Sequence, residues 1–262
     1  MRGNYLHSPI WHPKIRKGAR LEAEIRQLLT PEELAAARVV DIHREIQNAL
    51  QYDEYAWQWQ QGLEIAFPQR AEGLEVVLYQ CPQCEAEFHM GTQGADIFCT
   101  HCNARWHMDK LGRLESVSAL LPNGQSFPHI PDWYEWQRGN LHRDIDAGNY
   151  RLDANVRVEA LPNAKNFIYL GEGRLVHQPE GFSLTFCDYG DTQPKTLHFS
   201  SATAFSVHIE YDYRGKGQCI TLSTLDNTYF LYPVQPNAGF NATKIMFAAE
   251  YLHALSHKNT LM

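Results

Sequence analysis

The chain has 262 residues, of which 44% are hydrophobic, 12% aromatic and 20% charged. This composition is that of a folded globular protein and excludes an intrinsically disordered chain, and the length suits roughly one to two domains. The formal net charge of −7 disfavours a general nucleic-acid binder, because such affinity comes mainly from Lys and Arg on phosphates. No run of ~18 apolar residues and no signal-peptide core occurs, so we expect a soluble, cytoplasmic protein without a transmembrane segment.

Residues 1–73 are expected to form a small α/β segment. Its first 26 residues are basic, with six Lys and Arg against two Glu. The stretch Leu21–Leu29 fits a short strand. Thr30 is the predicted N-cap of a helix, and Glu33 completes a capping box. The apolar stripe of this helix would continue to Leu50 through Leu34, Ile42, Ile46 and Ala49.

Residues 74–116 contain the one strong chemical motif of the sequence. Two Cys-x2-Cys pairs, Cys81-Pro-Gln-Cys84 and Cys99-Thr-His-Cys102, are separated by 14 residues. Each pair can form a tight turn whose thiolates face one ion, and four thiolates are the usual tetrahedral shell of structural Zn²⁺. Short β-rich stretches at Leu74–Tyr79, 95–98 and 105–108 complete the pattern of a zinc ribbon. The sequence therefore predicts a structural zinc ion bound by Cys81, Cys84, Cys99 and Cys102.

Other interpretations of these cysteines are weaker. A reducing cytoplasm disfavours two disulfides, and a redox Cys-x-x-Cys normally occurs once, beside a βαβ unit. Catalytic zinc is disfavoured because four thiolates leave no position for water. His89, His101 and His107 lie near the pairs and could replace a cysteine, although we expect them to lie outside the ligand shell. Such a ribbon does not fold without its ion, so metal binding here would supply folding energy.

Residues 117–148 are predicted to form a linker followed by a connecting helix. Asp132 is the predicted N-cap of this helix, with Glu135 at the capping-box position, and Gly148 is the predicted C-terminal stop. Two tryptophans three residues apart share one face of the helix, and we expect them to pack in the core. They are Trp133 and Trp136.

Residues 149–262 are predicted to form an antiparallel β domain followed by one helix. Eight short alternating stretches, separated by Gly, Pro, Asn and Asp, have the pattern of strands. They are Val156–Leu161, Phe167–Leu170, Arg174–His177, Phe182–Phe186, Thr196–Phe199, Phe205–Ile209, Cys219–Leu222 and Tyr229–Tyr232. Gly171 and Gly173 are interpreted as a hairpin turn, and Asn241 as the cap of the final helix. Its apolar stripe is Ile245, Ala248, Leu252 and Leu255. This outline is typical of a PH-like barrel or sandwich, so we expect an α+β fold.

Several groups of residues, spread over most of the chain, carry a family resemblance. They are Tyr5-Leu-His-Ser-Pro-Ile-Trp11 with Arg16-Lys-Gly18, Arg70-Ala-Glu-Gly-Leu74 with Leu78-Tyr-Gln-Cys-Pro-Gln-Cys84, Pro131-Asp-Trp-Tyr-Glu-Trp-Gln-Arg138, Leu161-Pro-Asn-Ala164 and Leu170-Gly-Glu-Gly173. In them the chain resembles the C-terminal region, zinc ribbon plus PH-like domain, of bacterial PlsC-like 1-acyl-sn-glycerol-3-phosphate acyltransferases. The resemblance implies that residues 1–73 correspond to the tail of an acyltransferase domain.

The catalytic motifs of that family are missing from this sequence. In the family a His-x4-Asp pair activates the acceptor hydroxyl. None of the 13 histidines here has an Asp five positions later, and Phe67-Pro-Gln-Arg70 is not the family's phosphate-holding Pro-Glu-Gly-Thr-Arg motif. No phosphate-loop, nucleophile-elbow or His-Glu-x-x-His motif occurs either. We therefore assign no catalytic residue and expect a truncated or split homologue.

Two functions from different classes follow. The first is a non-catalytic zinc-binding accessory region or fragment associated with phospholipid (lysophosphatidate) acyl transfer. Its basic N-terminal stretch would face an acyltransferase catalytic domain or the acidic inner face of the membrane, and an ordinary solvated surface is an equally good interpretation of that stretch. The alternative is a standalone zinc-ribbon adaptor that binds protein or nucleic acid, although the few cations of the ribbon disfavour nucleic acid.

Overall fold

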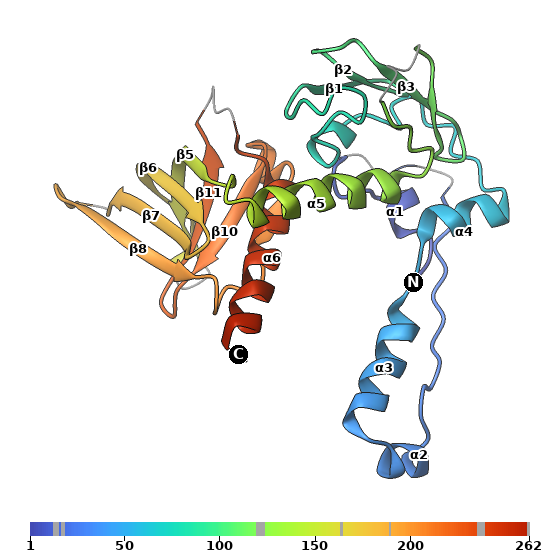
Figure 1. Ribbon diagram of the computed structural model, residues 1–262, viewed down its shortest axis with the longest axis horizontal. Coiled ribbons are helices and arrows are strands. Elements are labelled where there is room, and N and C mark those ends of the chain that lie inside the picture. The colour runs from blue at the N-terminus through green and yellow to red at the C-terminus, as the bar shows by residue number, and fades with distance from the viewer. Residues whose placement is uncertain are drawn as a thin grey trace.

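The computed structural model describes residues 1–12, 16, 19–118, 124–162, 165–188, 190–234 and 239–260. These residues form two antiparallel sheets and several helices, so the predicted α+β class is confirmed. Helix α5 (Ile130–Asp146) runs between the small sheet and the large one, and helix α6 (Ala242–Thr260) lies beside the large sheet (Figure 1). No helix of the described parts is long and apolar enough to cross a membrane.

The N-terminal region is helical rather than α/β. Its helices are α1 (Asn4–His7), α2 (Pro31–Ala36), α3 (Val39–Leu50) and α4 (Glu54–Gln61). The strand expected at Leu21–Leu29 is wrong, because this stretch forms only an isolated bridge between Glu22 and Arg2. The capping box is confirmed: the Glu33 N–H donates to Thr30 Oγ1 at 3.2 Å, and the Thr30 N–H donates to Glu33 Oε2 at 2.7 Å.

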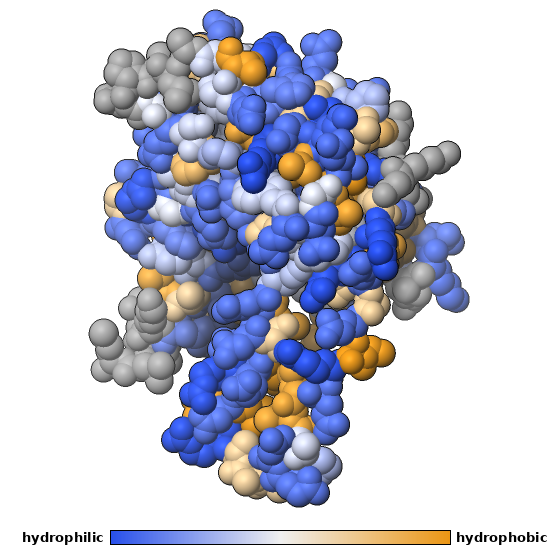
Figure 2. Space-filling view, turned by 90° about the vertical axis from the view of Figure 1, so that its right-hand side faces the viewer, coloured by the Kyte–Doolittle hydropathy of each residue, from blue (hydrophilic) through white to orange (hydrophobic). Residues whose placement is uncertain are grey.

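The segment 19–50, which we name the arm, projects from the rest of the molecule (Figure 1). The helix expected to continue to Leu50 is interrupted, because Ala37 and Arg38 have extended backbone between α2 and α3. Neither helix has a buried residue, and Leu34 of the expected apolar stripe is 51% exposed. Apolar residues gather over the arm at the lower end of Figure 2. The helical pattern predicted for this region is confirmed, and the apolar face of α3 is largely exposed, with Val39 83% and Ile46 44% exposed.

The small sheet has four antiparallel strands in the order β1-β2-β3-β4. They are β1 (Met90–Gln93), β2 (Asp96–Cys99), β3 (Arg105–Met108) and β4 (Leu114–Ser116). The strand expected at Leu74–Tyr79 is wrong, because η1 (Leu74–Val76) begins a 3-10 helix there. The Leu78 N–H donates to the Leu74 carbonyl at 2.8 Å, which is the hydrogen bond of a helical turn.

The large sheet is curled and has seven antiparallel strands in the order β8-β7-β6-β5-β11-β10-β9. They are β5 (Leu152–Ala160), β6 (Ile168–Gln178), β7 (Gly181–Cys187), β8 (Pro194–Ser200), β9 (His208–Glu210), β10 (Cys219–Ser223) and β11 (Thr228–Pro233). The hairpin turn expected at Gly171 and Gly173 is wrong, because both lie inside the long strand β6. Val158 faces Gly171 and Glu159 faces Tyr169, so Leu170 is an extra residue that forms a β-bulge in β6, beside Gly171 with φ +125°. A Cβ on Gly173 would lie 2.7 Å from the Thr185 carbonyl oxygen, which explains the glycine at that position.

Helices α5 and α6 differ in how well their starts were predicted. Helix α5 begins at Ile130 with His129 as N-cap, so the predicted N-cap, Asp132, lies in its first turn instead. Gly148 ends the helix with φ +74°, as predicted. The predicted cap of α6 is confirmed, because Asn241 Oδ1 accepts the Lys244 N–H at 2.9 Å. Its stripe is buried at Ile245, Ala248 and Leu252.

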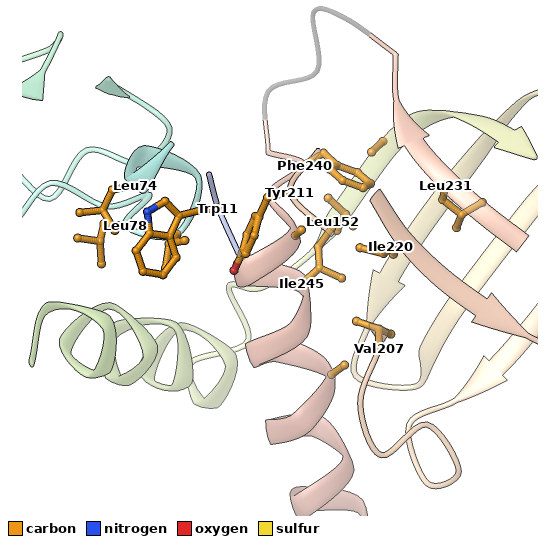
Figure 3. Close-up of a cluster of buried hydrophobic side chains, with 14 of the residues drawn as sticks. Trp11, Leu74, Leu78, Leu152, Val207, Tyr211, Ile220, Leu231, Phe240 and Ile245 are labelled. Carbon is orange, nitrogen blue, oxygen red and sulfur yellow. The ribbon is translucent and has the colours of Figure 1, made fainter. Parts of the chain in front are cut away.

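One continuous hydrophobic cluster joins the two halves of the protein. Figure 3 shows Trp11 packed beside Leu74 and Leu78 on the side of the small sheet, with Tyr211 and Ile245 on the side of the large sheet. Trp106 and Trp133, whose ring centroids lie 5.0 Å apart, belong to the same cluster and are fully buried. The two sheets therefore share a core that passes along α5 and the start of α6.

Candidate metal centre

Four cysteine side chains converge beside the small sheet. Cys81 Sγ lies 3.7 Å from Cys102 Sγ, and Cys84 Sγ lies 3.8 Å from Cys99 Sγ. All four sulfurs lie within 4.8 Å of one another, and within the described chain no other group of three or more His, Cys, Asp or Glu side chains is placed to hold a metal. The structure thus brings together all four residues named from their spacing, in a group that could hold one metal ion.

The two cysteine turns repeat one local structure. In each, the residue after the second cysteine has a left-handed backbone, Glu85 with φ 60° and Asn103 with φ 63°. The N–H of the first cysteine of each pair donates to the carbonyl of Ala86 at 2.9 Å and of Ala104 at 2.8 Å. This shared geometry turns both sulfurs of a pair to the same side. A left-handed Asn is common, whereas a left-handed Glu is not, so Glu85 is held there by the turn.

The thiols of the group differ in their tendency to ionise. Burial raises the pKa of the Cys81 and Cys84 thiols. Burial also acts to raise the pKa of Cys102, but the Ala104 N–H and the neighbouring cysteines outweigh it, and that pKa is lowered. Metal ions bind thiolates rather than thiols, and a cation among the sulfurs would favour the ionised form of all four.

The three nearby histidines are not part of this group. His107 Nδ1 lies 2.7 Å from Asp96 Oδ1, and its Nε2 lies 3.0 Å from Arg70 Nη2, so both ring nitrogens have other partners. The His89 and His101 rings lie 5.5 Å from one another. None of them is placed with the four sulfurs, so the group consists of cysteines.

The segment that leads into the first cysteine turn, Val76–Gln80, is held by helix α5. Gln137 is fully buried, and its Nε2 donates to the Val77 carbonyl at 2.7 Å. The indole N–H of Trp133 donates to the Gln80 carbonyl at 2.8 Å, and Asn140 Nδ2 donates to Gln80 Oε1 at 2.7 Å. We name Val76–Gln80 the junction segment, because it connects the cysteine turns to α5.

The start of helix α6 binds the first residue of the same junction segment, Val76. The Val76 carbonyl accepts hydrogen bonds from Asn241 Nδ2 at 3.0 Å and from Thr243 Oγ1 at 3.2 Å. Lys244 adds an ion pair with Glu87, which lies just beyond the first cysteine turn. These contacts were not predicted from the sequence. One signal was available: Gln137 lies four residues after Trp133, on the helix face expected to be buried.

Of the four described cations of the basic N-terminal stretch, Arg16 is buried, Arg2 and Arg20 are paired with glutamates, and Arg26 is exposed. Arg16 is only 5% exposed, and its Nη2 donates to the Arg70 carbonyl at 2.7 Å. Burial lowers the pKa of Arg16. Arg2 forms an ion pair with Glu24, and Arg20 forms one with Glu22. Two further cations of this stretch, Lys14 and Lys17, lie outside the described residues.

The fold and the site define an α+β protein with two antiparallel sheets and a four-cysteine group able to hold a metal ion. Comparison with protein-family models found no match, and comparison with curated proteins and with solved structures found no significant similarity.

Proposed function

We propose that this chain is a non-catalytic, zinc-binding accessory region of a phospholipid acyltransferase. The observation that carries the zinc part is the spacing of the sulfurs. A tetrahedral Zn²⁺ site with Zn–S bonds of ~2.3 Å has S–S edges of about 3.8 Å. The Cys81–Cys102 and Cys84–Cys99 sulfur separations, 3.7 and 3.8 Å, match this edge. Four thiolates fill the shell, so the ion would stabilise the fold without activating water.

The acyltransferase part of the proposal rests on the sequence groups in which the chain resembles PlsC-like acyltransferases, and the exposed apolar residues of the arm support it. Val39 is 83% exposed at the start of the amphipathic helix α3, and Ile25 is fully exposed in the non-helical part of the arm before Thr30. An apolar face of this kind on a soluble domain usually marks a protein contact. The partner that fits the resemblance is an acyltransferase catalytic domain. Residues 1–73 would form the tail of that domain.

The contact is proposed to be with protein rather than with acidic lipid headgroups. Arg16 is buried, and Arg2 and Arg20 are paired with Glu24 and Glu22. These cations are less able to attract phosphates than free ones. In the ribbon, Arg105 is likewise paired with Asp96 at 3.1 Å, which also weakens the case for nucleic acid.

The experiment mixes the purified zinc-loaded chain with the catalytic domain of a PlsC-like acyltransferase that carries the His-x4-Asp motif. Light scattering after size-exclusion chromatography should show a complex, and Val39→Asp or Ile25→Asp should abolish it. The matched control is Val117→Asp, since Val117 is 58% exposed but lies after β4. Acyl transfer from acyl-CoA to lysophosphatidate should require the catalytic domain.

Failure to form this complex would overturn the acyltransferase association. If the same apolar arm residues instead capture an unrelated protein, the alternative of a zinc-ribbon adaptor is favoured. Salt-dependent binding of DNA or RNA would favour the nucleic-acid form of that alternative.

A further inference from the structure

A pocket of about 650 Å³ opens at the base of the arm, away from the four cysteines. Its walls come from the N-terminal residues, the start of α4, the start of α5 and the chain just after β9. Figure 3 shows two of its lining residues, Trp11 and Tyr211, approaching one another from the two halves of the protein. This volume lies in the range of small-molecule sites, which are typically ~300–1,000 Å³.

The lining of the pocket is mostly apolar and aromatic. Its apolar side chains include Ile10, Val77 and Ile130. Six aromatic residues complete the wall: Tyr5, Trp11, Tyr52, Tyr55, Tyr134 and Tyr211. The Tyr5 and Trp11 rings are stacked, with centroids 6.0 Å apart and an angle of 28° between them. Aromatic faces are electron-rich, so such a wall suits either an apolar group or an organic cation.

The charged side chains of the lining are both acidic. They are Asp53 and Glu54, and no Lys, Arg or His side chain belongs to the described lining. Glu54 is 7% exposed, and its Oε1 accepts the Leu6 N–H at 3.0 Å. No ion pair with Lys or Arg is formed by Glu54 in the described parts of the chain. A buried carboxylate stabilised mainly by an N–H group favours a cationic ligand and repels an anionic one.

We propose that this pocket binds an apolar organic molecule that ends in an alkylammonium group. The apolar part would lie against Trp11, Ile130 and Tyr211. Arg138 already lies over the Tyr134 ring, 5.2 Å from its centroid. The ammonium group is therefore placed on the opposite side, near Tyr52, Glu54 and Asp53. Asp53 Oδ2 also lies 2.9 Å from His129 Nε2, so a bound cation would share this carboxylate with the histidine. This proposal does not depend on the association with an acyltransferase.

The test is calorimetric titration of the full zinc-loaded chain with decyltrimethylammonium below its micelle concentration. Trp11 offers a second readout through fluorescence. Decyl sulfate has the same apolar chain with the opposite charge, and tetramethylammonium has the cation without the chain. We expect saturable binding of decyltrimethylammonium, with both comparison compounds at least tenfold weaker.

Two variants locate the site. Tyr52→Ala removes one aromatic face from a residue that is already 45% exposed, and should weaken binding about five- to tenfold. Asp53→Asn removes a charge but keeps the side-chain oxygen that caps α4, and should weaken binding by a similar factor. The matched control, Tyr169→Ala, changes a residue of β6 that is 49% exposed and outside the pocket. Equal binding of decyl sulfate, no saturable binding, or unchanged affinity in both pocket variants would overturn the proposal.

Discussion

The side-chain oxygen Oε1 of Gln137 lies 3.1 Å from the backbone nitrogen of Tyr79, and both residues are almost fully buried. The same oxygen lies 3.4 Å from the Gln80 nitrogen, and Gln137 Nε2 donates to the Val77 carbonyl. A single amide of α5 thus satisfies three backbone groups of the junction segment, which ends one residue before Cys81. Buried backbone groups of this kind have no water to replace a lost partner.

We predict that Gln137→Leu destabilises the zinc-loaded protein by about 2–4 kcal/mol. The leucine fits the buried face of α5 but leaves the Tyr79 N–H and the Val77 carbonyl without their partner. Urea unfolding followed by circular dichroism measures the change. The control is Gln47→Leu on the exposed α3, which should change the free energy of unfolding by less than about 0.5 kcal/mol. Equal stability of the two variants would contradict the assigned role.

Removal of one metal ligand should abolish zinc binding and loosen the fold. We expect about one zinc ion per chain in the native protein by elemental analysis, and loss of that zinc in Cys81→Ser and Cys99→Ser. Cys187→Ser is the control, because Cys187 lies at the end of β7, outside the group. Zinc retained by both ligand variants would show that the ion binds elsewhere.

His177 should make the stability of the protein depend on pH. Burial lowers the pKa of His177 from 6.5 to about 3. Above pH 6.5 the ring is neutral in the folded and the unfolded chain, so its contribution is constant. As the pH falls from 6.5 towards 3, only the unfolded chain gains the proton, and the free energy of unfolding falls by up to ~1.4 kcal/mol per pH unit.

The comparison of the native protein with His177→Gln isolates this effect. Loss of zinc in acid affects both proteins, so the informative quantity is the difference between their two pH profiles. We expect the variant to be less stable at pH 7.5, because the ring stacks on Phe182 at 3.6 Å between centroids. The difference in the free energy of unfolding between the two proteins should then narrow as the pH falls below 6.5. Parallel profiles would show that His177 is protonated in the fold.

Gly73→Ala should destabilise the protein more than Gly190→Ala, although both glycines have a left-handed backbone. Gly73 has φ +86°, and an added Cβ would lie 2.1 Å from the Trp11 carbonyl oxygen. Gly190 has nearly the same backbone, φ +84°, but no atom lies within 4 Å of its added Cβ. We expect about 1 kcal/mol for Gly190→Ala from the left-handed backbone alone, and at least ~2 kcal/mol more for Gly73→Ala. Thermal unfolding of the two variants measures the difference.

The features predicted well from sequence are those that depend on few neighbouring residues. The Cys-x2-Cys spacing, the Thr30 capping box and the Asn241 cap each follow from local chemistry, and the structure brings each set together. The core face of α6 follows from its helical period.

The features predicted wrongly depend on distant partners. Gly171 was assigned to a turn because a bulge cannot be recognised without its partner strand β5. The apolar stripe of α3 has the pattern of a core helix, but coverage of that stripe depends on which elements reach it. Gln137 has the chemistry of a surface residue, and only the backbone of residues 77–80 explains its burial.

The junction segment also limits how this protein can be divided. Val76 is bonded to the start of α6, Val77, Tyr79 and Gln80 are bonded to α5, and Cys81 follows directly. A fragment that began at residue 149 would expose the face of α6 that meets Val76, and a fragment that ended at residue 116 would lose the donors of α5. The cysteine-bearing part is therefore not a portable module that could be exchanged between proteins. Its transfer would have to include the two helices that hold the junction segment in place.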